Sequence, residues 1–226
     1  QFFAPAGRFA QMMRRVGDAA GPANVKPASA TERWAPFGIA DARQVFAGVP
    51  FWWAIAGGWA IDLFLGAQTR PHGDLDLAVA RRDHAQIFAA LHPRWDCHVA
   101  AHGTLSPWNG DRLEGANSVW CRVPGELAWR FELLMTELED GDWVFRRDPR
   151  IRVRLDEAIL AGAPPYVAPH VQLLFKARHR QAKDDADLAR VLPGLAPERR
   201  RWLQAALRMT EGPGHPWVAF IQAPGP

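Results

Sequence analysis

The stretch AIAGGWAIDLFLGAQTRPHGDLDLAV, from Ala54 to Val79, decides how the rest of the chain is interpreted. It begins with a Gly57-Gly58 pair, continues with an apolar run of helical spacing, and ends in Asp74-Leu75-Asp76. The alternation of aspartate and leucine predicts a strand with Asp74 and Asp76 on one face. Two carboxylates that point the same way suit Mg²⁺, which completes its shell with water and phosphate oxygens.

The glycine pair predicts a phosphate site. The apolar run FWWAIA before it indicates a buried strand, and the helix that opens after it presents N–H groups at the positive end of a dipole. Arg70 suits a phosphate in bidentate fashion, and His72 would donate to a phosphate or order the loop. The run fits neither GxGxxG nor a P-loop. Each feature alone is typical of a turn or a solvated strand face, and their combination in one run favours a nucleotide site.

A third carboxylate is predicted at Glu132. Two-metal phosphoryl transfer uses a further acidic residue, and Glu132 lies in the strand-like run WRFELLM, where an unpaired carboxylate is costly to bury. It would bind a metal or act as the general base on an acceptor hydroxyl. The alternative is an ion pair with Arg130 on a solvent-facing strand. The rival carboxylates form a turn-like cluster that we expect to be solvated: Glu137, Glu139 and Asp140.

Composition narrows the class of protein. The chain has 226 residues, 48% hydrophobic and 11% aromatic, which predicts one domain or two small ones with a real core. A net charge of +3 is compatible with an anionic ligand and is weak support for nucleic acid. Two cysteines make no disulfide framework, which predicts a reducing, cytoplasmic location. The absence of an apolar run of about 18 residues argues against a membrane span.

The pattern of elements predicts an α+β fold. Residues 36–155 are expected to form a core with a mixed or antiparallel sheet and flanking helices. Residues 156–212 show helical periodicity and are expected to form a small C-terminal helical lobe. Residues 1–35 are interpreted as an N-terminal extension and residues 213–226 as an extended tail.

Taken together, GGWAIDLFLG and RPHGDLDLAV resemble the nucleotidyltransferase superfamily of DNA polymerase β-like fold. More narrowly, the stretch is similar to aminoglycoside and lincosamide nucleotidyltransferases that carry GGWxxDxxxGxxxRxHxDxDxxV. The matching positions are Gly57, Gly58, Trp59, Asp62, Gly66, Arg70, His72, Asp74, Asp76 and Val79. A looser similarity extends to Glu132 and to LLFKARHRQAKDDADL, residues 173–188.

The resemblance implies a role for each group of residues. It implies that the glycine pair contacts the triphosphate and that Asp74 and Asp76 hold Mg²⁺. Glu132 would be the third catalytic carboxylate and metal ligand, an assignment that rests on its strand pattern. Lys176, in the looser segment, would reach the nucleotide phosphates.

The reaction implied by the resemblance is a Mg²⁺-dependent transfer of a nucleoside monophosphate from an NTP, with ATP expected, to a hydroxyl of a small molecule. Pyrophosphate would be released, and an aminoglycoside or lincosamide antibiotic is the implied acceptor. The alternatives are a toxin-like transferase acting on tRNA or protein, and a non-catalytic nucleotide-binding member. The intact glycine pair and aspartate pair argue against the non-catalytic alternative.

Overall fold

A computed structural model describes residues 33–222 of the chain, which divide into two compact units, residues 33–168 and 169–222. The first unit is built on strands β1 (Arg33–Trp34), β2 (Trp53–Ile55), β3 (Asp76–Ala80), β4 (Asp96–Ala101), β5 (Thr104–Pro107), β6 (Ser118–Arg122), β7 (Ala128–Glu139), β8 (Asp142–Val144), β9 (Arg152–Arg154), β10 (Ile159–Leu160) and β11 (Tyr166–Val167). Its helices are α2 (Ile39–Val45), α3 (Gly57–Leu65), η1 (Arg81–Asp83), α4 (His84–Leu91) and α5 (Leu155–Ala158).

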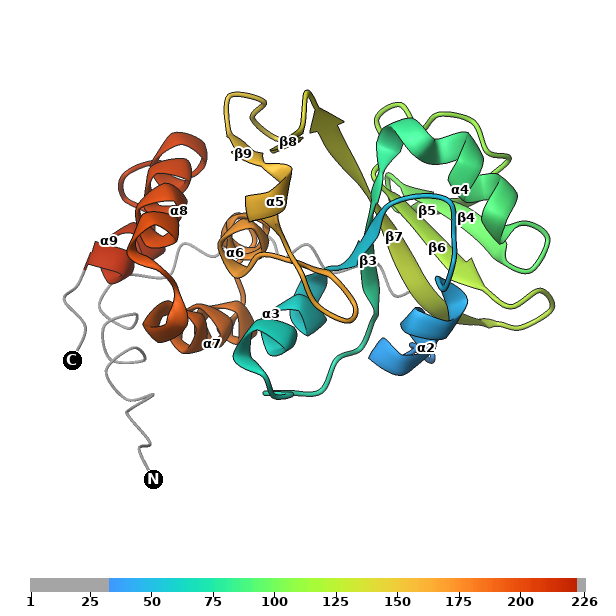
Figure 1. The fold of residues 1–226 in the computed structure, drawn as a ribbon, viewed down its shortest axis with the longest axis horizontal. Coiled ribbons are helices and arrows are strands. Elements are labelled where there is room, and N and C mark those ends of the chain that lie inside the picture. Colours follow the sequence, from blue (N-terminus) through green and yellow to red (C-terminus); the bar gives the residue numbers. More distant parts are fainter. Residues whose placement is uncertain (1–32, 223–226) are drawn as a thin grey trace. The chain divides into compact units, whose positions relative to one another are not determined.

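The sheet of the first unit is mixed. Its main strand order is β10-β11-β2-β3-β7-β6-β4-β5, with β1 and β8 also paired to β7 and β9 paired to β8. Strands β3 to β9 of this unit are labelled in Figure 1. Strand β3 is antiparallel to β2 and parallel to β7, whereas β4, β5 and β6 form antiparallel pairs that join the sheet at β7. The predicted α+β fold, a mixed sheet with flanking helices, is confirmed.

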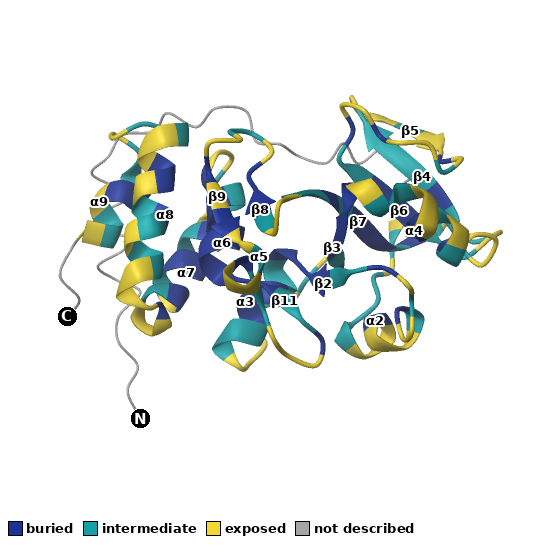
Figure 2. Ribbon diagram, turned by 45° about the horizontal axis from the view of Figure 1, so that its top comes forward, coloured by how far each residue is buried: buried dark blue, intermediate teal, exposed yellow. Residues whose placement is uncertain are grey.

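Strands β3 and β7 lie at the centre of the core. Leu77 and Val79 of β3 and Phe131 and Leu133 of β7 are completely buried, and Figure 2 shows these strands largely in dark blue. Each such side chain contributes about 1.5–3 kcal/mol to stability when it leaves water. Because alternate residues of a strand face opposite ways, this burial fixes which face carries Asp76 and Glu132.

A buried arginine ties the loop before β6 to the sheet. The Arg81 guanidinium donates to the carbonyl oxygens of Leu113, at 2.5 Å, and Ala116, at 2.7 Å, and also to the side chains of Glu137 and Asn117. Four acceptors around one guanidinium satisfy a charge that is costly to bury unpaired. Arg81 thus couples the end of β3 to β7 and to the loop that leads into β6.

Several elements differ from the sequence-based expectation. Residues 156–168, expected to belong to the C-terminal helical lobe, instead contain the end of the four-residue α5 and the strands β10 and β11. Strand β3 begins at Asp76, so the prediction that Asp74 also lies within the strand is wrong by two residues.

The second unit, residues 169–222, is helical. It contains α6 (Pro169–Ala177), α7 (Ala182–Val191), η2 (Leu192–Gly194), α8 (Pro197–Thr210) and α9 (Pro216–Gln222). Helix α9 occupies a segment that was predicted to be extended. No helix among residues 33–222 has the length and apolar character needed to cross a membrane. The predicted domain boundaries at residues 35, 155 and 212 stay predictions, and most of the predicted N-terminal extension lies outside the described residues.

Candidate active site

The first glycine of the pair allows the backbone to approach a carboxylate. Gly57 begins α3 with φ of +65°, a conformation that favours glycine. A Cβ at this position would overlap Oδ2 of Asp76. The Ala56 N–H donates to the Asp76 carbonyl oxygen at 2.8 Å, which closes the segment between β2 and β3. The N-terminal end of α3 and the Asp76 carboxylate therefore lie side by side.

The second glycine allows a different approach. A Cβ on Gly58 would lie 2.5 Å from Nη2 of Arg70 and would overlap Nδ1 of His72. Ala56, the N-cap residue, has no side-chain acceptor for the first-turn N–H groups. The helix end thus combines its positive dipole with the Arg70 guanidinium, an arrangement suited to an anion such as a phosphate.

Asp76 and Glu132 are brought together by strand register. They are direct partners in the parallel β3–β7 pair, which places their side chains on the same face of adjacent strands. Glu132 is buried, and the Ser118 hydroxyl donates to its Oε1 at 2.5 Å. Asp74 lies two residues before β3 begins. Like charges on paired residues repel one another, so this pair of carboxylates favours a cation between them.

The alternative role of Glu132, an ion pair with Arg130 on a solvent-facing strand, is wrong. Glu132 is only 5% exposed. Arg130 pairs instead with Glu126 at 2.5 Å and donates to the carbonyl oxygen of Ala35. The low-charge run around Glu132 thus reflects burial, as its sequence pattern indicated.

The rival carboxylates of the acidic cluster lie toward the far end of β7. Glu137 accepts from the buried Arg81, and Glu139 pairs with Arg152. Asp140 has φ of +51° in the turn that leads to β8. Their contacts are those of a strand end and its turn, so Glu132 remains the carboxylate of β7 that lies beside Asp76.

The donor set suits magnesium chemically. Carboxylate oxygens are the ligands that Mg²⁺ prefers, and one or two of them suffice when phosphate and water supply the rest. Within residues 33–222, no three His, Cys, Asp or Glu side chains converge closely enough to hold a metal ion by themselves. The pair Asp76 and Glu132, with Asp74 close by in sequence, offers the carboxylate oxygens that a divalent cation would use at this place.

Lys176 lies in the second unit. Its Nζ donates to Asp184 at 2.7 Å and lies 3.2 Å from Asp187. Asp184 also accepts from the Gln181 N–H at the start of α7, so it caps that helix. The expectation that Lys176 reaches nucleotide phosphates stays a prediction.

Asp62 is part of the site but received no role from its sequence pattern. Its Oδ2 lies 2.5 Å from Nε2 of His72, and Oδ1 accepts from both the N–H and the hydroxyl of Thr69. Burial raises the pKa of Asp62, but the hydrogen bonds from His72 and Thr69 outweigh it and hold that pKa below its usual value. The sequence feature that could have pointed to Asp62 is its matching position in the motif GGWxxDxxxGxxxRxHxDxDxxV, ten residues before His72.

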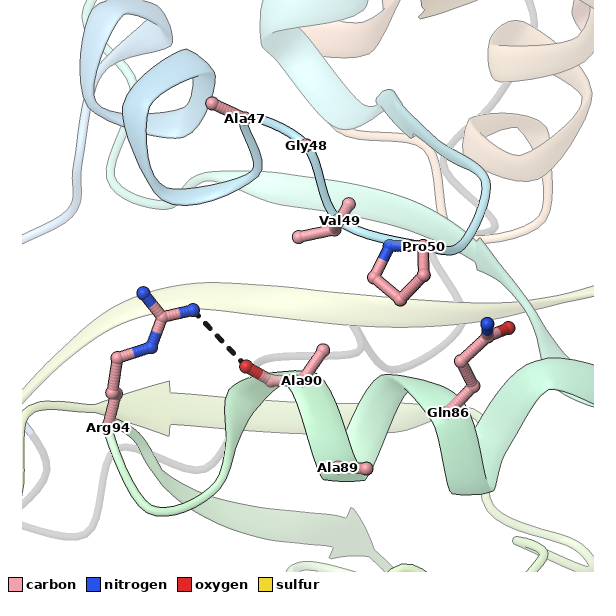
Figure 3. A pocket seen from close by; sticks show the side chains of 8 residues that line it. All are labelled: Ala47, Gly48, Val49, Pro50, Gln86, Ala89, Ala90 and Arg94. Carbon is pink, nitrogen blue, oxygen red and sulfur yellow. Dashed lines mark hydrogen bonds between the residues drawn. The ribbon is translucent and has the colours of Figure 1, made fainter.

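A separate hollow of about 410 Å³ lies between the loop before β2 and helix α4 (Figure 3). Its lining is mainly small and apolar, with Gln86 and Arg94 as the polar side chains; the other residues are Ala47, Gly48, Val49, Pro50, Ala89 and Ala90. The loop precedes β2, whereas the glycine turn follows it. Since no carboxylate lines it, this cavity lacks the chemistry of the glycine turn and its aspartate.

Comparisons with known proteins agree with the fold. A family model described as aminoglycoside-2''-adenylyltransferase matches residues 39–98. The solved structure of ANT(2'')-Ia in complex with adenylyl-2''-tobramycin aligns with a TM-score of 0.53 at 16% identity, over 76% of this chain and 97% of that chain. No curated protein matches the chain significantly.

Two further solved structures align less closely. A lincosamide antibiotic adenylyltransferase, LnuA, bound to lincomycin, gives a TM-score of 0.48 at 15% identity over 68% of this chain and 93% of that chain. An antigenic nucleotidyltransferase-like protein from Paracoccidioides brasiliensis gives 0.46 at 18% identity, over 82% of this chain and 90% of that chain.

The resemblance read from the sequence is thus confirmed by the family model and by the alignment with the solved structure of ANT(2'')-Ia. The protein has the nucleotidyltransferase fold, and over residues 39–98 it matches the aminoglycoside-2''-adenylyltransferase family.

Proposed function

We propose that the protein transfers a nucleoside monophosphate from an NTP, with ATP as the expected donor, to a hydroxyl of a small molecule. The observation that carries this proposal is the register pair of Asp76 and Glu132 beside the glycine turn at Gly57. The match at residues 39–98 covers the turn and Asp76, and it supports an aminoglycoside as the acceptor class.

The donor half of the reaction belongs to the glycine turn. The first-turn N–H groups of α3 and the Arg70 guanidinium bind the triphosphate, because each offers hydrogen-bond donors and positive charge to phosphate oxygens. Asp74 and Asp76 are the residues that would hold Mg²⁺, with Glu132 left beside them to accept a proton. When bound, the metal neutralises charge on the phosphate oxygens and helps to orient them.

Glu132 is proposed as the general base. In this step the acceptor hydroxyl oxygen attacks the α-phosphorus, its proton passes to the Glu132 carboxylate, and the bond from the α-phosphorus to pyrophosphate breaks. The Ser118 hydroxyl, which donates to Oε1 of Glu132, fixes the orientation of that carboxylate. The burial of Glu132 keeps it out of bulk water, where hydration would compete with proton transfer.

The test is a transfer assay. The protein is incubated with each NTP, Mg²⁺ and a panel of hydroxyl-bearing acceptors that includes aminoglycosides and lincosamides, and products are detected by mass spectrometry. We expect a nucleotide adduct of at least one small acceptor. Asp76→Asn and Glu132→Gln should each lower the rate by about 100-fold or more, the scale of a lost general base.

Glu139→Gln is the matched control. Glu139 lies on the same strand, seven residues beyond Glu132 and therefore about 23 Å away along β7. It is half-exposed and pairs with Arg152, so its loss should leave the rate unchanged. Labelling of tRNA or a protein with no small-molecule product would refute the proposed acceptor class. Nucleotide binding without any transfer would support the non-catalytic alternative instead.

A further inference from the structure

Three polar side chains form a chain of hydrogen bonds behind the glycine turn. Oδ2 of Asp62 lies 2.5 Å from Nε2 of His72, and Nη1 of Arg70 lies 3.1 Å from Nδ1 of the same ring. The side chains of Asp62 and His72 are 4% and 2% exposed. The Trp59 ring packs against the His72 ring with centroids 4.4 Å apart, which fixes the plane of the imidazole.

Asp62 and Arg70, which flank His72 in this series of hydrogen bonds, determine the tautomer of His72. An ionised carboxylate only accepts hydrogen bonds, and a guanidinium only donates them. Nε2 must therefore carry the proton that Asp62 accepts, and Nδ1 must offer its lone pair to Arg70. Asp62 keeps its accepting role because two Thr69 donors hold its other oxygen, and its pKa lies below its usual value once these bonds outweigh burial.

Arg70, the last residue in this series of hydrogen bonds, lies at the anion site. Nη2 of Arg70 would be 2.5 Å from a Cβ on Gly58, so the guanidinium packs directly on the turn. Its Nη1 also donates to the Pro71 carbonyl oxygen at 3.2 Å. Nη1 lies between Nδ1 of His72 and the Pro71 carbonyl oxygen, so the acceptor that His72 presents is one of the contacts that position the guanidinium against the turn.

We propose that Asp62 is a positioning residue for the nucleotide triphosphate: it fixes the Nε2–H tautomer of His72, and the lone pair on Nδ1 then holds Arg70 against the glycine turn. This inference rests on the proposed function for its ligand. It is separable from catalysis, because it concerns proton placement and anion binding in the absence of an acceptor molecule.

The decisive variant is Asp62→Asn. An asparagine that keeps its carbonyl oxygen toward Thr69 turns its NH₂ group toward Nε2 and donates to it. The ring proton then moves to Nδ1, where its N–H faces the N–H of the guanidinium. We expect the ring ¹⁵N shifts of His72 to report this change of tautomer. Affinity for inorganic triphosphate, measured by calorimetry, should fall about tenfold or more, the scale of a charged hydrogen bond.

Asp41→Asn makes the same chemical change at another helix and serves as the control. Asp41 accepts from the Gly38 N–H at the start of α2, so this variant should leave both the His72 spectrum and the triphosphate affinity unchanged. Arg70→Ala should weaken triphosphate binding by itself. Adding Asp62→Asn to Arg70→Ala should then lower the triphosphate affinity little further, because Asp62 acts through Arg70.

Two results would overturn the proposal. The first is a wild-type ¹⁵N spectrum with the His72 proton on Nδ1, a measurement that needs no variant to fold. The second is an equal loss of triphosphate affinity from Asp62→Asn in the wild-type and Arg70→Ala backgrounds, which would show that Asp62 does not act through Arg70. If the His72 tautomer and the triphosphate affinity change as expected in Asp62→Asn, but no NTP is consumed with any acceptor, the proposed function fails while this inference stands.

Discussion

Stability of the helical unit should depend on pH through His170. This residue of α6 is 1% exposed, its ring packs edge-on against Trp202, and among the described residues its Nδ1 has no hydrogen-bond partner. Burial, together with the positive charge of Arg199, lowers the pKa of His170 from 6.5 to about 4. Burial has this effect because it disfavours the charged imidazolium.

The sign follows from proton binding. Between pH 6.5 and about 4 the unfolded chain binds a proton that the folded protein does not, so the contribution is fully present above pH 6.5 and is lost as pH falls toward 4. Between pH 8 and pH 5 the His170 contribution to the free energy of unfolding should fall by about 2 kcal/mol.

The assay is urea unfolding at pH 8 and pH 5 for the wild type and for His170→Phe, which keeps an aromatic ring beside Trp202. The wild type should lose about 2 kcal/mol more than the variant between the two pH values. His179→Gln, at an exposed position of the same unit, controls for the loss of a histidine. An equal loss in His170→Phe and wild type, or an imidazole NMR titration of His170 near pH 6.5, would refute the reasoning.

Three further perturbations test the first unit. Gly57→Ala should lower the free energy of unfolding by about 1–2 kcal/mol because of its positive φ, and it should displace the Asp76 carboxylate. Gly66→Ala, with φ of +72° and nothing within 4 Å of its Cβ, should show the backbone cost alone. Equal activity of the two variants in the transfer assay would contradict a role for the close approach of Gly57 to Asp76. Arg81→Met should lower the free energy of unfolding by about 3 kcal/mol or more because it leaves several buried acceptors without a donor. A change below about 1 kcal/mol in denaturant unfolding would contradict this role of Arg81. Burial raises the pKa of Asp96, but hydrogen bonds from Arg122 and His98 outweigh it and hold that pKa below its usual value. The contribution of Asp96 to the free energy of unfolding is therefore present above about pH 4 and is lost as pH falls below that. Asp96→Asn should make the free energy of unfolding fall less steeply at acid pH, and an unchanged acid dependence would show that other carboxylates govern it.

The local geometry of the glycine turn was predictable because its signals lie close together in the sequence. The glycine pair, Arg70 and the aspartates lie in one run whose residue types and spacing predict a turn, a helix and a strand. Glu132 was predicted by a different argument, the cost of burying a carboxylate in an apolar strand. That argument named the residue but gave no partner, since strand register depends on contacts between distant segments.

Other features lay beyond the reach of the sequence. The hydrogen bonds of Asp62 require residues 62–72 to fold back on themselves, and a helical position gives no hint of that. Strands β10 and β11 are two residues each and exist because they extend the sheet beside β2, so a helical pattern concealed them. Helix α9 was missed because glycines and prolines precede it, although Pro216 suits the first turn of a helix.

The bond from the Ala56 N–H to the Asp76 carbonyl oxygen also bears on how the chain folds. It closes a loop of 20 residues, whereas 56 residues separate Asp76 from Glu132, so less chain entropy is lost in bringing the glycine turn to Asp76. Glu132 joins this local structure only when β7 docks, a contact across a much longer stretch of chain. We therefore expect amide protons of the turn and of β3 to gain protection before the β3–β7 pairing is complete, a sequence of events that pulsed hydrogen exchange during refolding would resolve.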